Sequence, residues 1–192
     1  IYIKKFFEYD SLGNLIQEVH YNSNDSLLSR MKFSYDSNNN IIKETEFNSD
    51  SLMVLECLLT YTSFNAVMGK ECFSSSGKSE NDNNGFSKYL YKYNSNHNLT
   101  EESLFDKLGG LVSLYNNSYD VNGDMITRDH FGSDNTFQND NYGISKYRYL
   151  YDNNNLIEEH HYKSDGNLIR KFLNEYNENN YISSRLEYFE EN

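Results

Sequence analysis

The sequence predicts an all-β protein, a repetitive antiparallel β-meander of about seven hairpins that forms one elongated or curled sheet. An aromatic residue followed by a turn-forming residue recurs through the whole chain, which is the mark of a repeat architecture. Around each copy, apolar residues recur at every second position rather than at every third or fourth, which is the period of a β-strand. The recurring tyrosines are Tyr9, Tyr35, Tyr61, Tyr93, Tyr119, Tyr151 and Tyr176, at spacings of 26, 26, 32, 26, 32 and 25.

A strand is predicted immediately before each of these tyrosines. Phe7 and Tyr9 alternate with Glu8, and Phe33 and Tyr35 alternate with Ser34. Such alternation is typical of a strand with one face buried.

A second strand is predicted after each turn, between an apolar residue and an aromatic residue six positions later. Because six is a multiple of two, we expect both residues to share one face of the strand. The pairs are Leu15 and Tyr21, Ile41 and Phe47, Val67 and Phe73, Leu99 and Phe105, Met125 and Phe131, Leu156 and Tyr162, and Ile182 and Tyr188.

The connections are predicted to be tight turns. Gly13-Asn14, Asn122-Gly123 and Asp165-Gly166 supply residues that accept positive φ, as hairpin turns of the primed types require. The Asn-rich tracts have two interpretations. They could serve aggregation or ligand binding, or their side chains could form hydrogen bonds with the backbone of the turns. Turn backbone is the favoured interpretation.

The alternation places aromatic side chains on one face of the predicted sheet and charged side chains on the other. The charged face would carry Lys4, Arg30, Glu56, Lys88, Lys146 and Lys171 before the turns, and Glu18, Glu44, Lys70, Glu102, Arg128, Glu159 and Arg185 after them. Charge at the last strand, from Glu187, Glu190 and Glu191, would either protect an exposed edge or form a solvated end.

A longer period is superimposed on the hairpins. Residues 35–92 align with residues 93–150 without a gap, at an offset of 58. Every second connection is longer than its neighbours, so we expect two long loops, near 74–85 and 132–143, at one edge of the sheet. We predict that residues 1–192 form a single β-repeat domain.

Composition excludes several classes of protein. The balance of 17 Lys and Arg against 29 Asp and Glu gives a net charge of −12, which lacks the basic footprint of nucleic-acid binding. No apolar run is long enough for a transmembrane helix. Since residue 1 is Ile, we expect an upstream leader or a larger upstream region.

The segment Tyr9-Asp10-Ser11-Leu12-Gly13-Asn14-Leu15-Ile16, echoed at residues 165–169, resembles the YD repeat of RHS-type proteins. It is also similar to the MORN-like repeats of certain bacterial antitoxin and surface proteins. The RHS resemblance implies a long meandering β-sheet and a secreted or cell-surface location. With only seven units and no visible toxin segment, we do not expect this chain to enclose another domain.

The best candidates for ligand or partner contact are three tyrosines outside the seven recurring positions, and the two long loops. Most aromatic rings are interpreted as core, whereas Tyr89, Tyr115 and Tyr147 are expected to be exposed and able to stack on a sugar or a partner. Each long loop contains Asn-Asp-Asn-x-Gly, which nominates Asp82, Asn83, Asp140 and Asn141. This pattern resembles a calcium loop but lacks its downstream Glu, so an Asx-rich turn is favoured and no metal is assigned.

No catalytic constellation is present, and we predict that the chain is not an enzyme and needs no cofactor. His20, His130 and His161 fall at one repeat position and are interpreted as a surface ladder rather than a metal site. Cys57 and Cys72 flank the 62–66 turn. If Tyr61 pairs with Val67, strict alternation puts the two thiols on opposite faces, so free thiols are favoured, whereas a slip of one residue would oppose them.

These features predict a non-catalytic protein-interaction or scaffold module of a bacterial secreted or cell-surface protein or envelope complex, with one or more protein partners. A carbohydrate-binding module using exposed tyrosines is the first alternative. The second alternative is a cytoplasmic immunity or antitoxin-like protein, whose acidic surface would act as a decoy that binds a basic toxin.

Overall fold

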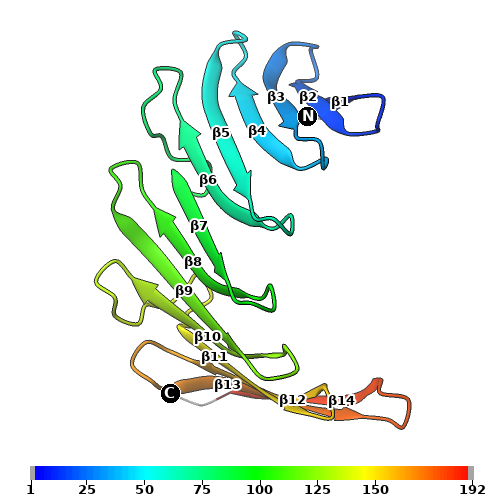
Figure 1. Cartoon of the computed structure of the whole chain (residues 1–192), viewed down its shortest axis with the longest axis vertical. Helices are drawn as coiled ribbons and strands as arrows, with labels where there is room; N and C mark the ends of the chain where they lie inside the picture. Colours follow the sequence, from blue (N-terminus) through cyan, green and yellow to red (C-terminus); the bar gives the residue numbers. More distant parts are fainter. Residues whose placement is uncertain (1–2, 190–192) are drawn as a thin grey trace. The chain divides into compact units, whose positions relative to one another are not determined.

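The computed structural model describes residues 3–189, which fold as 14 antiparallel β-strands whose order in the sheet follows their order in the chain. The predicted all-β meander is confirmed (Figure 1). The strands are β1 (Lys4–Tyr9), β2 (Leu15–Tyr21), β3 (Leu27–Tyr35), β4 (Ile41–Phe47), β5 (Met53–Tyr61), β6 (Val67–Phe73), β7 (Lys88–Tyr93), β8 (Leu99–Phe105), β9 (Leu111–Tyr119), β10 (Met125–Gly132), β11 (Lys146–Asp152), β12 (Asn155–Tyr162), β13 (Leu168–Tyr176) and β14 (Ile182–Phe189).

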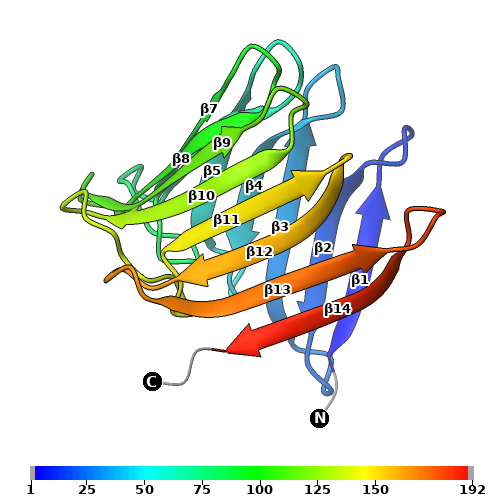
Figure 2. The ribbon, with the colours of Figure 1, turned by 90° about the horizontal axis from the view of Figure 1, so that it is seen from below.

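The strands belong to two compact units. The first contains the residues up to Leu90 together with Leu104–Gly110, and the second contains Tyr91–Ser103 together with the residues from Leu111 onward. In each unit, short turns link consecutive strands except across one long connection, between β6 and β7 in the first unit and between β10 and β11 in the second, and the ribbon can be followed in Figure 2. No described residue belongs to a helix that could cross a membrane.

The short turns share one five-residue geometry. At Asp36, the amide donates to Asn40 O, while the amide of Asn39 donates to Asp36 O, and Asn39 has φ +63°. A type I turn followed by one left-handed residue has this pattern. The side chain of Asp36 completes it, because its Oδ1 accepts the amides of Asn38 and Asn40. The predicted primed turns are therefore wrong for most connections. The turn at Asn153-Asn154, where both residues have positive φ, is of the two-residue kind.

Four of the repeat tyrosines, Tyr35, Tyr61, Tyr119 and Tyr176, have a structural task of their own. Tyr35 Oη donates to Leu15 O at 2.7 Å, and Tyr61 Oη donates to Ile41 O at 2.7 Å. In the second unit Tyr119 donates to Leu99 O at 2.7 Å and Tyr176 to Leu156 O at 3.0 Å. Each bond spans 20 residues and ties one hairpin to the preceding one, so the Tyr-Asx pair combines a clamp between hairpins with a cap for the turn.

A β-bulge follows each short turn for which the register is described. Tyr9 pairs with Leu15, but Glu8 pairs with Gln17, so Ile16 is the extra residue. The pairings across the two long connections, β6–β7 and β10–β11, run without a shift. A bulge exchanges the faces of all residues beyond it.

These bulges make the predicted division of the faces wrong. Leu15 lies opposite Tyr9, whereas Tyr21 lies opposite Lys4 on the other face of the sheet. We call the face that carries Tyr35, Tyr61, Tyr119 and Tyr176 the tyrosine face. Charged residues predicted for the other face lie on it, directly across from Phe7, Phe33, Leu59, Asn117 and Tyr149: these are Glu18, Glu44, Lys70, Arg128 and Glu159.

The opposite face carries a second ladder, in which aromatic rings alternate with cations. The Arg30 guanidinium lies 4.5 Å from the centre of the Phe47 ring, its cross-strand partner. The Lys4–Tyr21, Lys146–Tyr162 and Lys171–Tyr188 pairs have the same arrangement in register. Both faces are thus partly aromatic, in keeping with the 30 Tyr and Phe residues of the chain. Few aliphatic side chains among residues 3–189 are fully buried.

Cys57 and Cys72 form a disulfide, so the prediction of free thiols is wrong. Tyr61 pairs with Val67 as expected, but Thr60 pairs with Gly69, which leaves Met68 as the bulge residue. This shift brings Cys57 directly opposite Cys72, with their Cα atoms 4.0 Å apart. Both cysteines are buried.

At the last strand, Glu187 pairs with Arg170 at 3.2 Å, so this carboxylate takes part in a cross-strand ion pair. Glu190 and Glu191 lie outside the described residues.

Candidate functional site

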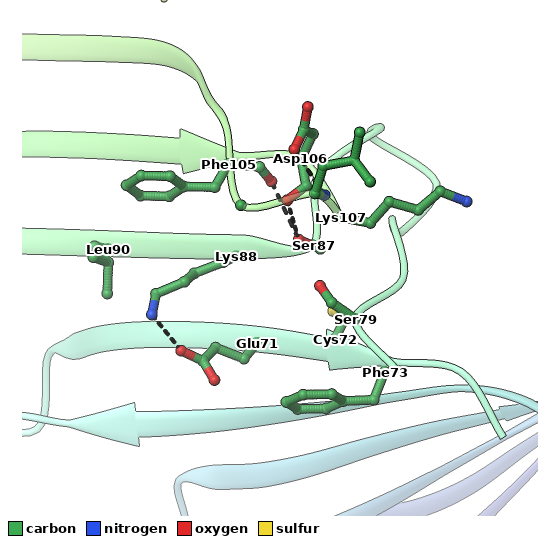
Figure 3. A pocket seen from close by; sticks show the side chains of 12 residues that line it. Glu71, Cys72, Phe73, Ser79, Ser87, Lys88, Leu90, Phe105, Asp106 and Lys107 are labelled. Carbon is green, nitrogen blue, oxygen red and sulfur yellow. Dashed lines mark hydrogen bonds and ion pairs between the residues drawn. The ribbon is translucent and has the colours of Figure 1, made fainter. Parts of the chain in front are cut away.

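The first unit contains a pocket of about 520 Å³ (Figure 3). Its residues Glu71 and Phe73 alternate with Lys70 and Cys72, so they lie on the face opposite the tyrosine face. It is lined by β6, the beginning of β7, the end of β8 and the turn that follows β8. The lining residues are Glu71, Cys72, Phe73, Ser79, Ser87, Lys88, Leu90, Phe105, Asp106, Lys107, Leu108 and Gly109.

The pocket combines apolar walls with paired charges. Phe73, Phe105 and Leu90 supply apolar surface. Lys88 Nζ lies 2.6 Å from a carboxylate oxygen of Glu71, and both side chains are substantially exposed. Lys107 is paired with Glu80 at 2.8 Å. An aromatic wall beside a carboxylate suits a ligand with both a ring and a polar or charged group.

The long connection after β6 creates this pocket. Its chain returns beside β6, since Glu80 N donates to Cys72 O and Cys72 N donates to Ser87 O. Ser79 forms an isolated bridge with Phe73, which fixes its side chain at the pocket wall. Ser87 is 2% exposed, and its hydroxyl donates to Asp106 O at 2.8 Å, which holds the turn after β8 at the rim.

The second long connection repeats this framework 58 residues later. Gln138 N donates to His130 O, and His130 N donates to Ser145 O, as Glu80, Cys72 and Ser87 do in the first copy. Phe131 forms an isolated bridge with Phe137, at the positions equivalent to Phe73 and Ser79.

The occupants of the equivalent positions differ. The Phe137 ring stacks on Phe131 with 4.6 Å between ring centres, and Lys146 Nζ lies 3.7 Å from the centre of the Phe137 ring. In the first copy, Ser79 provides no ring between Phe73 and Lys88. The first pocket is therefore open where the second copy holds an aromatic side chain.

A second difference concerns the neighbouring carboxylate. Asp129 accepts from Arg148 at 2.6 Å in the second copy. Leu90 stands at the position of Arg148 in the first copy, and the equivalent carboxylate, Glu71, pairs with Lys88 instead. The first copy thus lacks both the ring and the guanidinium that complete the second.

The predicted exposure of Tyr89 is wrong, because the side chain is 8% exposed. The turn at residues 82–86 lies over β7, and Tyr89 Oη donates to Asp82 Oδ2 at 2.8 Å. Tyr147 and Asp140 repeat this contact at 2.7 Å. Burial and the bond to Asp140 raise the pKa of Tyr147. Each pair holds its own long connection against the strand that follows it.

Tyr115 is half-buried, and two side chains contact its ring. The His130 ring stacks on it at 4.3 Å, and the Arg128 guanidinium lies 4.5 Å from the ring centre. Its ring is therefore largely occupied by contacts within the chain.

Asn83 and Asn141 are exposed at the tips of their turns. Asp82 and Asn83 also border a smaller pocket of about 200 Å³ on the tyrosine face, with Met31, Glu44, Glu46, Leu55, Cys57, Lys70 and Asn84. Asp82 Oδ1 accepts the amides of Asn84 and Phe86, and Asp140 Oδ1 accepts those of Tyr142 and Ile144. The Asn-Asp-Asn-x-Gly pattern thus encodes a capped turn.

Two of the three histidines expected at the surface are buried. His130 is 4% exposed and His161 is 6% exposed. Burial lowers the pKa of His130, whose Nε2 lies 2.5 Å from Ser113 Oγ. His161 Nε2 donates to Glu159 at 2.7 Å, and this bond is the main cause of a lowered pKa for Glu159. No cluster of three or more metal-ligating side chains occurs among residues 3–189.

The pocket beside Phe73 was not among the predicted sites. Its sequence signal is the exchange of Ser79 for Phe137 and of Leu90 for Arg148 between two otherwise aligned copies. Parity alone does not reveal that these positions line one cavity, because the return of the long connection along β6 brings them together.

No protein-family model and no curated protein matches the chain. Among solved structures, the crystal structure of TcdB2-TccC3 matches 98% of this chain and 13% of its own length, at 12% identity and a TM-score of 0.49. The Tc holotoxin pore of Photorhabdus luminescens matches 97% of this chain and 13% of its own length, at 11% identity and a TM-score of 0.41. A porin-like protein from Bacteroides uniformis matches 95% of this chain and 87% of its own length, at 10% identity and a TM-score of 0.35. This chain spans only a small part of the toxin structures, and none of these similarities assigns a family or a function.

Proposed function

We propose that this chain is a non-catalytic protein-interaction module of a secreted or cell-surface protein. The observation that supports the location is the buried Cys57–Cys72 disulfide. Structural disulfides persist in oxidising compartments and are rare where glutathione and thioredoxin keep thiols reduced. The pocket beside Phe73, with apolar walls and exposed charges, supports the interaction role.

The test is the thiol content of the protein as its native host makes it. The cells are quenched with acid, the chain is denatured, and free thiols are labelled and counted by mass spectrometry. We expect no labelled cysteine in the mature protein. Two labelled cysteines would contradict the proposed location. Cross-linking in the same host, followed by mass spectrometry, should recover a protein partner, and recovery of only the monomer would contradict the interaction role.

The disulfide counts against the cytoplasmic immunity alternative. The carbohydrate alternative loses one of its nominated rings, since Tyr89 is buried and bonded to Asp82. A glycan array with the intact chain would test what remains of it, and binding to any defined glycan would favour it over the protein-interaction role.

A further inference from the structure

We infer that the pocket beside Phe73 binds an aromatic side chain that stands next to a basic side chain in a partner polypeptide. This inference rests on the proposed interaction role and gives the chemistry of the partner. It comes from the comparison of the two copies, because the second copy contains within its own chain the groups that the first copy lacks.

The pocket in the first copy lies where the second copy holds the Phe137 ring. In the second copy, the Phe137 ring contacts both the Phe131 ring, at 4.6 Å between ring centres, and the Lys146 ammonium group, at 3.7 Å from the ring centre. Phe73 and Lys88 stand at the equivalent places in the first copy and both line the open pocket. An aromatic ring from another chain would gain the same stacking and cation–π contacts there.

The Glu71 carboxylate would need a new cationic partner once an aromatic ring occupied the pocket. If Lys88 turns toward an incoming ring, as Lys146 does toward Phe137, it leaves the Glu71 carboxylate without its present partner. Asp129 solves this problem in the second copy by pairing with Arg148. Leu90 cannot do so, which favours a ligand that brings its own guanidinium or ammonium group.

The net charge of the chain favours a ligand of positive charge. The chain has a net charge of −12, so a basic segment is attracted toward it, while an acidic segment is repelled. The pocket itself is balanced, with Lys88 and Lys107 against Glu71 and Asp106. The whole chain therefore favours a basic aromatic segment over an acidic one.

The experiment measures binding of short blocked peptides to the intact, oxidised chain by isothermal titration calorimetry at low salt. The probe peptide is acetyl-Ser-Phe-Arg-Ser-amide, and the controls replace Phe by Ala or Arg by Glu. We expect one site for the probe and at least tenfold weaker binding of each control. Equal binding of the probe and either control would overturn the inference.

Variants of the chain test whether the probe binds in the pocket beside Phe73. Ser79→Phe supplies the missing ring and should weaken probe binding at least tenfold, while Ser37→Phe, in an exposed turn of the same unit, should leave it unchanged. Unchanged binding to Ser79→Phe would contradict the assignment. Should this variant fail to fold, Glu71→Gln serves instead, and it should weaken binding of the probe but not of a peptide with citrulline in place of Arg.

Phe137→Ser gives a converse test, because it removes the ring from the second copy. It should allow phenol, as a free ring, to bind there, since Arg148 already supplies the cation. The chain could pass both tests of the proposed function, with its disulfide formed and a partner cross-linked in the native host, and still fail to bind the probe. That result would overturn the pocket assignment alone and leave the proposed function standing.

Discussion

Cys72 and His130 occupy equivalent positions, 58 residues apart, and join equivalent strand pairs by different chemistry. Cys72 is bonded to Cys57 across β5 and β6. The His130 ring stacks on Tyr115 across β9 and β10, with 4.3 Å between ring centres. Both residues follow the same bulge and both carry the hydrogen bonds to the returning long connection. The strand pair at the base of each long connection is thus fixed by a disulfide in one copy and by the stacked rings of His130 and Tyr115 in the other.

Replacing both cysteines, Cys57→Ala with Cys72→Ala, should lower the free energy of unfolding. The disulfide joins residues separated by 15 positions, for which restriction of the unfolded chain contributes about 3 kcal/mol. Urea denaturation at pH 7 measures the change. The wild-type chain in reducing agent should lose a similar amount, and a stable reduced chain would show that the bond contributes little.

Stability should fall as the pH drops below 6.5 because of His130. Its pKa is lowered by burial, so the unfolded chain binds a proton more readily than the folded chain in this range. The contribution is complete above the unfolded pKa of about 6.5 and is lost as the pH falls toward the folded value. Asp140 opposes this shift and Arg128 reinforces it. His130→Phe should reduce the dependence on pH between 7 and 5, measured by urea denaturation, and an identical slope in the two proteins would contradict the assignment.

Tyr61→Phe should destabilise the first unit by about 1 kcal/mol, since it removes the hydrogen bond to Ile41 O and leaves that carbonyl without the hydroxyl donor. Tyr181→Phe is the matched control, because Tyr181 is 71% exposed and should change stability by less than about 0.5 kcal/mol. Thermal and urea denaturation of both variants measure the difference. Equal effects of the two substitutions would mean that the clamp between hairpins has no energetic role.

Gly13→Ala should cost about 1 kcal/mol through backbone strain alone. Gly13 has φ +86°, and a Cβ atom there would meet no other atom within 4 Å, so no clash adds to the strain. Asn39 takes the same position in the next repeat at φ +63°, so Asn39→Gly should lose only the exposed hydrogen bond that Asn14 Nδ2 donates to Asn39 Oδ1 at 3.1 Å, and it should cost clearly less than Gly13→Ala. Denaturation of the two variants checks the pair, and a loss in Asn39→Gly as large as in Gly13→Ala would contradict this account of the turn.

Phe137→Ala should lower the free energy of unfolding by about 1–2 kcal/mol, because a half-buried ring loses its stack on Phe131 and its contact with Lys146. Val121→Ala, at a residue 97% exposed, should have no measurable effect. Urea denaturation followed by circular dichroism distinguishes them. A neutral Phe137→Ala would show that the ring adds little to its own site, and it would weaken the comparison with the pocket beside Phe73.

The strands and the positions of the turns, although not the type of most turns, could be predicted because their signals are local. Alternation set the strand before each turn, and Asx or Gly at fixed positions set the turn itself, as at Asp36 and Gly13. The 58-residue offset was also visible, since it is a comparison of residues along the chain.

The faces, the disulfide and the pocket were decided only by the tertiary structure. One extra residue, such as Met68 after its turn, reverses the parity of a strand, and hydrogen bonding between strands determines where it falls. The Met68 bulge brought Cys57 opposite Cys72, and the equivalent bulge at Ile42 placed Glu44 opposite Phe33. The pocket depends further on the return of the long connection along β6, through bonds between residues distant in the chain. Local patterns determine which segments are strands, whereas contacts across strands determine which side chains meet.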